Sequence, residues 1–160
     1  MKYRDNGAIG ALLDEYERSI SELISVIKEI SNQQLSTIID HETKDEDCRS
    51  IQTILTHIVG AGYAYAHYIR THQGENIARY NRTHLDTARQ YIDALHKMFL
   101  DTENLFQTHP TIALEESNQD KKMHVSWGQY YDVEQLMEHA IVHILRHRRQ
   151  IERFILKLAS

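Results

Sequence analysis

The chain has 160 residues, of which 41% are hydrophobic, and a formal net charge of −5. This length allows a single domain over residues 1–160 to bury a full core, and the one cysteine, Cys48, excludes an internal disulfide and a cysteine-based zinc cluster. Because no basic block accompanies the negative charge, nucleic acid and acidic membrane surfaces are disfavoured as partners.

Apolar residues recur with helical spacing along most of the chain, which predicts an all-α fold. The first helix is predicted over residues 8–30, where apolar and charged side chains occupy opposite faces. Residues 31–32 can end this helix or mark a bend, since residues 33–35 can carry helical structure on toward Ile39. The charged segment 40–47 has no apolar periodicity and is predicted to be a connector.

The second helix is predicted over residues 48–71, with Asp47 or Ser50 as its N-cap. His57 lies on one flank of the apolar stripe of this helix. Taken alone, a histidine in such a position is more often a hydrogen-bonded core residue than a metal ligand. Gly74 is predicted to end the helix.

Small side chains follow His57 along the same line of the helix, at Gly60, Ala61 and Ala64. They can keep the neighbourhood of an ion open for water and substrate, as an open coordination position requires. They can equally allow two helices to approach closely, and the sequence leaves both interpretations open.

The third helix is predicted to begin at Thr83, which could form a capping box with Asp86, and to end at His109. His96 lies beside its apolar stripe and is interpreted as structural, because no other potential ligand on this helix joins it. The segment 110–131 is the longest connection, and we expect its apolar tail to fold back on the bundle as a lid.

The fourth helix is predicted over residues 132–158, with Asp132 and Gln135 as a capping box. His143 and His147 lie inside its apolar sector, one turn apart, where a core favours leucine. Side chains at positions i and i+4 are roughly 5–6 Å apart at Cβ, so both rings can reach one ion.

Taken alone, this pair of histidines is as consistent with two core residues that have this spacing by chance as with a pair of metal ligands, because a metal site needs further donors. His57 supplies a third donor if the four helices pack as a bundle. Three neutral imidazoles with one or two waters form an open site, and imidazole suits zinc, nickel, copper or iron. The Glu-x-x-His pairs of diiron bundles and the zinc-protease motif HExxH are both absent from the sequence.

The segments SIQTILTHI and EHAIVHILRHRRQI resemble motifs of the DinB/YfiT-like family of metal-dependent enzymes. The order of helices and the long connection before the last helix also match, so the resemblance covers nearly the whole chain. It implies an up-down-down-up four-helix bundle, often dimeric, with His57, His143 and His147 holding nickel or zinc. Arg149 stands where the family usually has glycine, a difference expected to affect packing or dimerisation more than coordination. His139 matches a position that is often histidine without being a principal ligand.

The same resemblance implies an activity. Members of the family include transferases that act on low-molecular-weight thiols such as bacillithiol, and a mycothiol-dependent isomerase; a related domain occurs in ergothioneine synthesis. We therefore expect a metal-dependent hydrolase or thiol transferase with a small-molecule substrate. No catalytic base is assigned. His139, Tyr68 and His67 are candidates only because they lie near the helix faces that carry the predicted ligands.

Two alternatives to an enzyme stay open. One is a stress-linked protein that binds a small molecule or a metal without catalysis, and the other is a dimerisation bundle with core histidines. The first residues lack the apolar run of a signal peptide, and no window reaches membrane-spanning length. We therefore expect a cytoplasmic protein without a membrane partner, and the family resemblance implies that it is a homodimer.

Overall fold

The computed structural model describes residues 3–159, and four long helices dominate that part of the chain. The elements of the described residues are, in chain order, α1 (Gly7–Ile27), α2 (Asn32–Ser36), the 3₁₀ turn η1 (Glu46–Cys48), α3 (Ile51–His72), α4 (Ala88–Thr108), the 3₁₀ turn η2 (Gln119–Lys121), β1 (Met123–His124), β2 (Tyr130–Tyr131) and α5 (Val133–Ala159). Apart from the short antiparallel pair of β1 and β2, the regular structure is helical, so the prediction of an all-α fold is confirmed.

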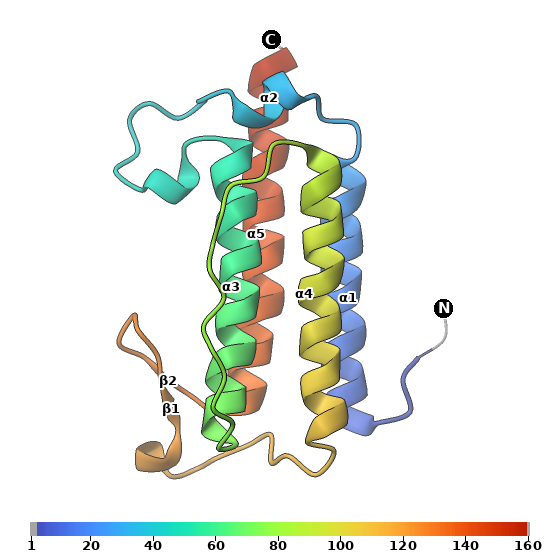
Figure 1. The fold of residues 1–160 in the computed structure, drawn as a ribbon, viewed down its shortest axis with the longest axis vertical. Coiled ribbons are helices and arrows are strands. Elements are labelled where there is room, and N and C mark those ends of the chain that lie inside the picture. Colours follow the sequence, from blue (N-terminus) through green and yellow to red (C-terminus); the bar gives the residue numbers. More distant parts are fainter. Residues whose placement is uncertain (1–2, 160) are drawn as a thin grey trace.

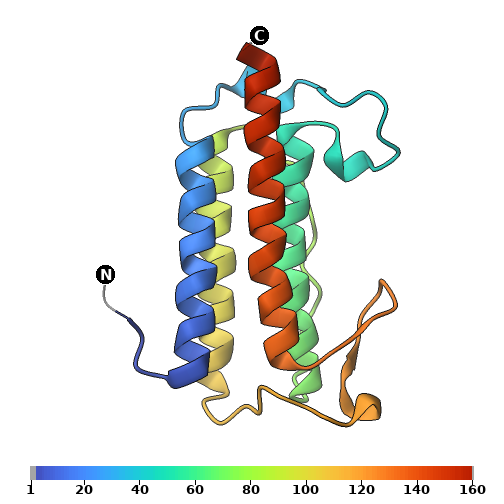
Figure 2. The same ribbon diagram turned by 180° about the vertical axis from the view of Figure 1, so that it is seen from behind.

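The four long helices lie side by side along the long dimension of the molecule (Figure 1). α1 and α5 run in one direction and α3 and α4 run in the other, as the view from behind also shows (Figure 2). α1 packs against α4 and α5, and α3 packs against the same two helices. The helix that carries His57 is therefore a direct neighbour of the helix that carries His143 and His147.

Capping boxes begin α3 and α5 at positions that the sequence predicts. Ser50 and Thr53 form the box of α3, so Ser50 and not Asp47 is the N-cap. At the start of α5, the Gln135 N–H donates to the Asp132 carboxylate at 2.9 Å, and the Asp132 N–H donates to the Gln135 side chain at 3.1 Å. These bonds satisfy backbone N–H groups that have no partner in the first helical turn.

The predicted start of the third long helix, at Thr83 with Asp86, is wrong. The N-cap of α4 is four residues later, where Thr87 and Gln90 form the capping box. Residues 73–87 instead run back along α3 as a connector without helical structure (Figure 1).

Tertiary hydrogen bonds hold this connector extended. The Nδ1 atom of His84 lies 3.0 Å from the Thr56 hydroxyl on α3, and the Leu85 N–H donates to the Tyr91 hydroxyl at 3.1 Å. The Gln52 side chain donates to the Leu85 carbonyl at 2.9 Å. A helix beginning at residue 83 would have to break these contacts, so the later capping box prevails over the earlier one.

The first predicted helix ends three residues early, at Ile27, and the chain restarts as α2 with Ser31 and Gln34 as its capping box. The segment 40–47 is a connector as predicted, and its last residues enter η1. Gly74 follows the end of α3 with a φ of +87°, a conformation that glycine adopts without steric cost.

The apolar stripes of the four long helices meet in one core, which includes fully buried residues from every long helix. Gly62 allows α3 to approach its neighbours closely. A Cβ at this position would lie 2.9 Å from the Tyr16 hydroxyl and would overlap the Met98 side chain of α4. Within the described part of the chain, no helix combines the length and apolar character that crossing a membrane demands.

Candidate metal centre

Three histidines that lie far apart in the sequence meet between α3 and α5. His57 comes from α3, and His143 and His147 come from consecutive turns of α5. Each offers one ring nitrogen, and these three nitrogens all lie within 4.8 Å of one another. The ring centroids are 4.5–5.0 Å apart. The cluster brings together the three residues that the sequence predicts as ligands, and it could hold a metal ion.

Neighbouring side chains orient two of the three rings. The Nδ1 atom of His57 lies 3.1 Å from the Asp47 carboxylate, and the Nδ1 atom of His147 lies 3.0 Å from the side-chain oxygen of Gln150. Both acceptors require a hydrogen on Nδ1, so a neutral ring leaves its Nε2 without one. A lone pair is then available on the nitrogen that faces the cluster, as metal-binding histidines require.

The inward nitrogens are poorly satisfied by the protein alone. The Nε2 atom of His147 is buried and has no hydrogen-bond partner. The Nε2 atoms of His57 and His143 face each other at 2.9 Å, where at most one of them carries a hydrogen in the neutral rings. Buried nitrogen atoms without donors cost free energy, whereas a bound cation would satisfy all three. The donor set therefore fits a metal ion.

Burial keeps these rings neutral. Desolvation, together with repulsion from His57 and Arg146, lowers the pKa of His147 to about 4 in spite of its hydrogen bond with Gln150. Desolvation also lowers the pKa of His143, followed by repulsion from His147 and His57. The pKa of His57 is lowered by burial in spite of the nearby Asp47 carboxylate. Neutral imidazole is the form that binds metal, so no proton has to be displaced at neutral pH.

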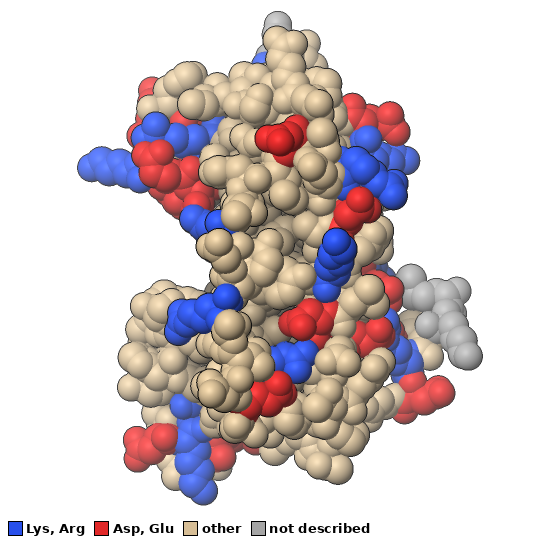
Figure 3. Space-filling view, in the orientation of Figure 1, with Lys and Arg blue, Asp and Glu red and all other residues tan. Residues whose placement is uncertain are grey.

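A cavity of about 640 Å³ lies beside the cluster, and both His57 and His143 line it. The surface is hollowed at this point, between the segment that carries η1 and the loop between β1 and β2 (Figure 3). His147 is not among the lining residues and is 4% exposed. The cluster thus has one open side, through which a small molecule can reach it.

The small residues of α3 have two different roles. Gly60, Ala61 and Ala64 line the cavity, which favours the first of the two interpretations of this stretch. Close helix approach occurs instead at Gly62, which contacts α4. At Gly60 the missing side chain makes room for Arg82 of the connector, because a Cβ there would lie 2.7 Å from the Arg82 Cδ.

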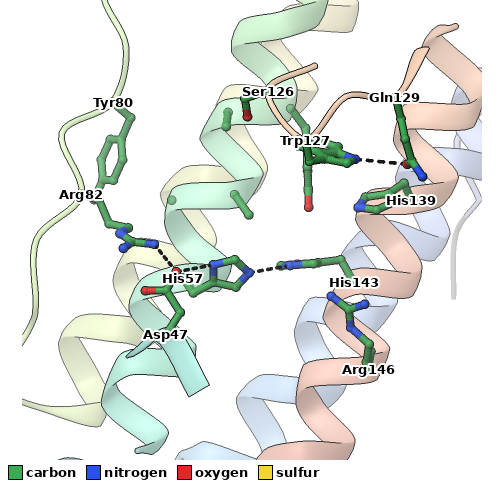
Figure 4. A pocket seen from close by; sticks show the side chains of 14 residues that line it. Asp47, His57, Tyr80, Arg82, Ser126, Trp127, Gln129, His139, His143 and Arg146 are labelled. Carbon is green, nitrogen blue, oxygen red and sulfur yellow. Dashed lines mark hydrogen bonds and ion pairs between the residues drawn. The ribbon is translucent and has the colours of Figure 1, made fainter. Parts of the chain in front are cut away.

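Asp47 links the connector of residues 73–87 to the histidine cluster. Its carboxylate accepts a hydrogen bond from the Arg82 guanidinium at 2.8 Å and lies on the Nδ1 side of His57 (Figure 4). The pKa of Asp47 is lowered because Arg82 and His57 together outweigh the effect of its burial. The carboxylate is therefore ionised at neutral pH and can hold the His57 ring in place.

Aromatic rings form the wall of the cavity opposite the connector. Trp127, in the loop between β1 and β2, stacks on His139 with ring centroids 5.5 Å apart. Tyr65 meets Trp127, His139 and His143 edge-on. The hydroxyl of Tyr131 lies 3.3 Å from the Nδ1 atom of His139. The tail of the long connection does fold back on the bundle, as expected, and covers one side of the cavity.

The other histidines and tyrosines that the sequence singles out have different surroundings. His139 lines the cavity, one turn before His143, but is not part of the three-nitrogen cluster. The hydroxyl of Tyr68 accepts a hydrogen bond from the Ser126 N–H at 2.9 Å, and His67 lines a smaller neighbouring cavity. His96 is exposed on α4.

The sequence does not predict the residues that support the ring positions, namely Asp47, Gln150 and Arg82, or Arg146, which lines the cavity. Asp47 stands in a connector and was considered only as a helix cap. Gln150 is three residues after His147, a spacing that puts both on one helix face and could have indicated the contact.

The chain matches no protein-family model. A search of curated proteins finds no significant match. Inference about its function therefore starts from the residues of the cluster and its cavity.

Proposed function

We propose that this chain is a metal-dependent enzyme related to the DinB/YfiT-like family, in which His57, His143 and His147 hold zinc or nickel. The observation that carries the proposal is the meeting of three imidazole nitrogens from two helices beside an open cavity. The contacts of Asp47 and Gln150 with the outer nitrogens support it, because partners of this kind are typical of metal-binding histidines.

The directions of the four long helices are those of an up-down-down-up bundle, which supports the proposed relationship to this family. The motifs that carry the resemblance lie on α3 and α5, where the clustered histidines are. The homodimer and the cytoplasmic location expected from the sequence stay predictions.

Three histidine ligands leave a coordination position for a further group. A bound divalent metal lowers the pKa of a coordinated water or thiol and so supplies a nucleophile at neutral pH. The chain itself positions the ligands through Asp47 and Gln150, and aromatic rings line one wall of the cavity. Two reactions fit best. One is hydrolysis of a small molecule by the coordinated water, and the other is transfer of a low-molecular-weight thiol.

Metal analysis of the untagged protein tests the metal centre. We expect close to one zinc or nickel per chain after purification, and His143→Ala should lower this content strongly without loss of helicity. His96→Ala is the matched control, because His96 is also on a long helix but is exposed and outside the cluster. Equal metal content in the two variants would contradict the proposal.

Activity is tested separately on the metal-loaded protein, with a panel of small thiols and electrophiles and with ester and amide substrates. Turnover that His143→Ala abolishes and His96→Ala retains supports an enzyme. Tight metal binding with no turnover across the panel supports the alternative, a non-catalytic protein that binds a small molecule or a metal.

A further inference from the structure

The charges around the cavity are unequal. The lining residues include two arginines, Arg82 and Arg146, and one carboxylate, Asp47. The neutral histidines add no negative charge, and a bound divalent metal would add two positive charges. A concave site with an excess of one sign of charge attracts ligands of the opposite sign. The cavity is therefore suited to an anion.

The two arginines differ in what they already bind. Arg82 donates to Asp47 at 2.8 Å, so the Asp47 carboxylate balances its charge. Arg146 has no carboxylate partner among the described residues. Its side chain extends from α5 beside His143, toward the cavity (Figure 4).

The opposite side of the cavity is apolar and aromatic. Trp127 and Tyr65 face it from the loop and from α3, and Ala61 and Ala64 widen it. A ligand held by Arg146 at one end can therefore place an apolar part against these rings. Guanidinium groups bind carboxylates through two parallel N–H donors, which also fixes the direction of the ligand.

We propose that the substrate of this site is a small organic anion whose carboxylate binds Arg146, with its reacting atom at the histidine cluster and its apolar part against Trp127. This inference rests on the proposed function, because it concerns the substrate of the same site. It makes Arg146 a specificity-determining residue.

The test compares two thiols of nearly equal shape, mercaptoacetate and mercaptoacetamide, which differ in the charge of one group. Binding to cobalt-loaded protein has two readouts. A thiolate-to-cobalt absorption band reports ligation of the metal, and tryptophan fluorescence reports occupation of the cavity, because Trp127 is the only tryptophan in the chain.

We expect the unmodified protein to bind mercaptoacetate roughly tenfold more tightly than the amide, as a charge-assisted hydrogen bond implies. Arg146→Gln should remove most of this preference. Arg149→Gln is the matched control, because it removes the same charge from an exposed residue of the same helix that does not line the cavity. It should keep the preference.

Equal binding of the two thiols to the unmodified protein, or no binding of either, would overturn the inference. So would a preference that persists in Arg146→Gln, since it would then come from chelation of the metal by the carboxylate. A fluorescence change with the carboxylate preference but no cobalt band would support the anion site and refute ligation of the thiol to the metal, the step that a thiol transferase requires. The two proposals can therefore fail separately.

Discussion

Asp47→Asn tests whether the carboxylate beside the cluster sets its metal affinity. The substitution keeps the shape of the side chain and removes its charge. In the folded protein, this carboxylate lies 3.1 Å from the Nδ1 atom of His57 and 2.8 Å from a nitrogen of Arg82. An asparagine oxygen can still accept a hydrogen bond from His57, so the variant isolates the contribution of the charge.

The expected magnitude follows from these contacts. A hydrogen bond to an ionised acceptor contributes about 1 kcal/mol more than one to a neutral acceptor, which corresponds to somewhat less than a tenfold change in affinity. The loss of the carboxylate's attraction for the metal adds to this, so zinc affinity should fall roughly 10-fold, the lower end of the range for such partners. The exposed pair with Arg82 contributes only about 0.2–1 kcal/mol to folding, so stability should change little.

Competition titration with a chromophoric zinc chelator measures the affinity, and urea unfolding of the metal-free protein measures the stability. Glu42→Gln is the matched control, because it removes the same charge from an exposed residue of the same connector. Unchanged zinc affinity in Asp47→Asn would refute the argument that the charge of this carboxylate contributes to metal binding. Equal losses in both variants would mean that only general electrostatics is involved.

Two further predictions concern packing and pH. Gly62→Ala should lower the free energy of unfolding by about 1–3 kcal/mol in urea titrations, because the new methyl group overlaps the buried contact with α4. Gly60→Ala should cost less, since the flexible Arg82 side chain can move aside; equal losses would contradict this assignment of the two glycines. The metal-free protein should lose stability as the pH falls below about 6.5, because the unfolded chain then binds protons that buried His143 and His147 do not accept. Between pH 6.5 and the folded pKa of His147, about 4, each ring lowers the free energy of unfolding by about 1.4 kcal/mol per pH unit. Urea titrations in EDTA measure this change, and a midpoint that stays constant over this range would refute the burial of the two rings.

Helical periodicity was sufficient to predict the long helices, because each buries one apolar face in the same core. It failed at the start of α4, where two consecutive four-residue sequences, beginning at Thr83 and at Thr87, both match a capping box. The choice between them depends on contacts of His84 and Leu85 with residues of α3 and α4. Tertiary contacts of this kind cannot be predicted from local sequence patterns.

The ligands and their supports differ in the same way. His143 and His147 stand out because they interrupt an apolar stripe at a four-residue spacing, and His57 joins them because the family resemblance pairs the two motifs. Asp47 and Arg82 are in segments without periodicity, where a charged residue is expected in any case. Only the folded arrangement shows that one carboxylate contacts both a ligand and a connector.

These contacts form a series that explains why a glycine one turn from His57 matters to the cluster. Because Gly60 has no side chain, the connector can lie against α3 and place the Arg82 stem over the helix. Arg82 then reaches Asp47, and Asp47 holds the Nδ1 side of His57. The connector thus helps to keep the inward nitrogen of His57 available. Since the same connector borders the cavity, the segment that shapes the cavity also supports the proposed ligand beside it.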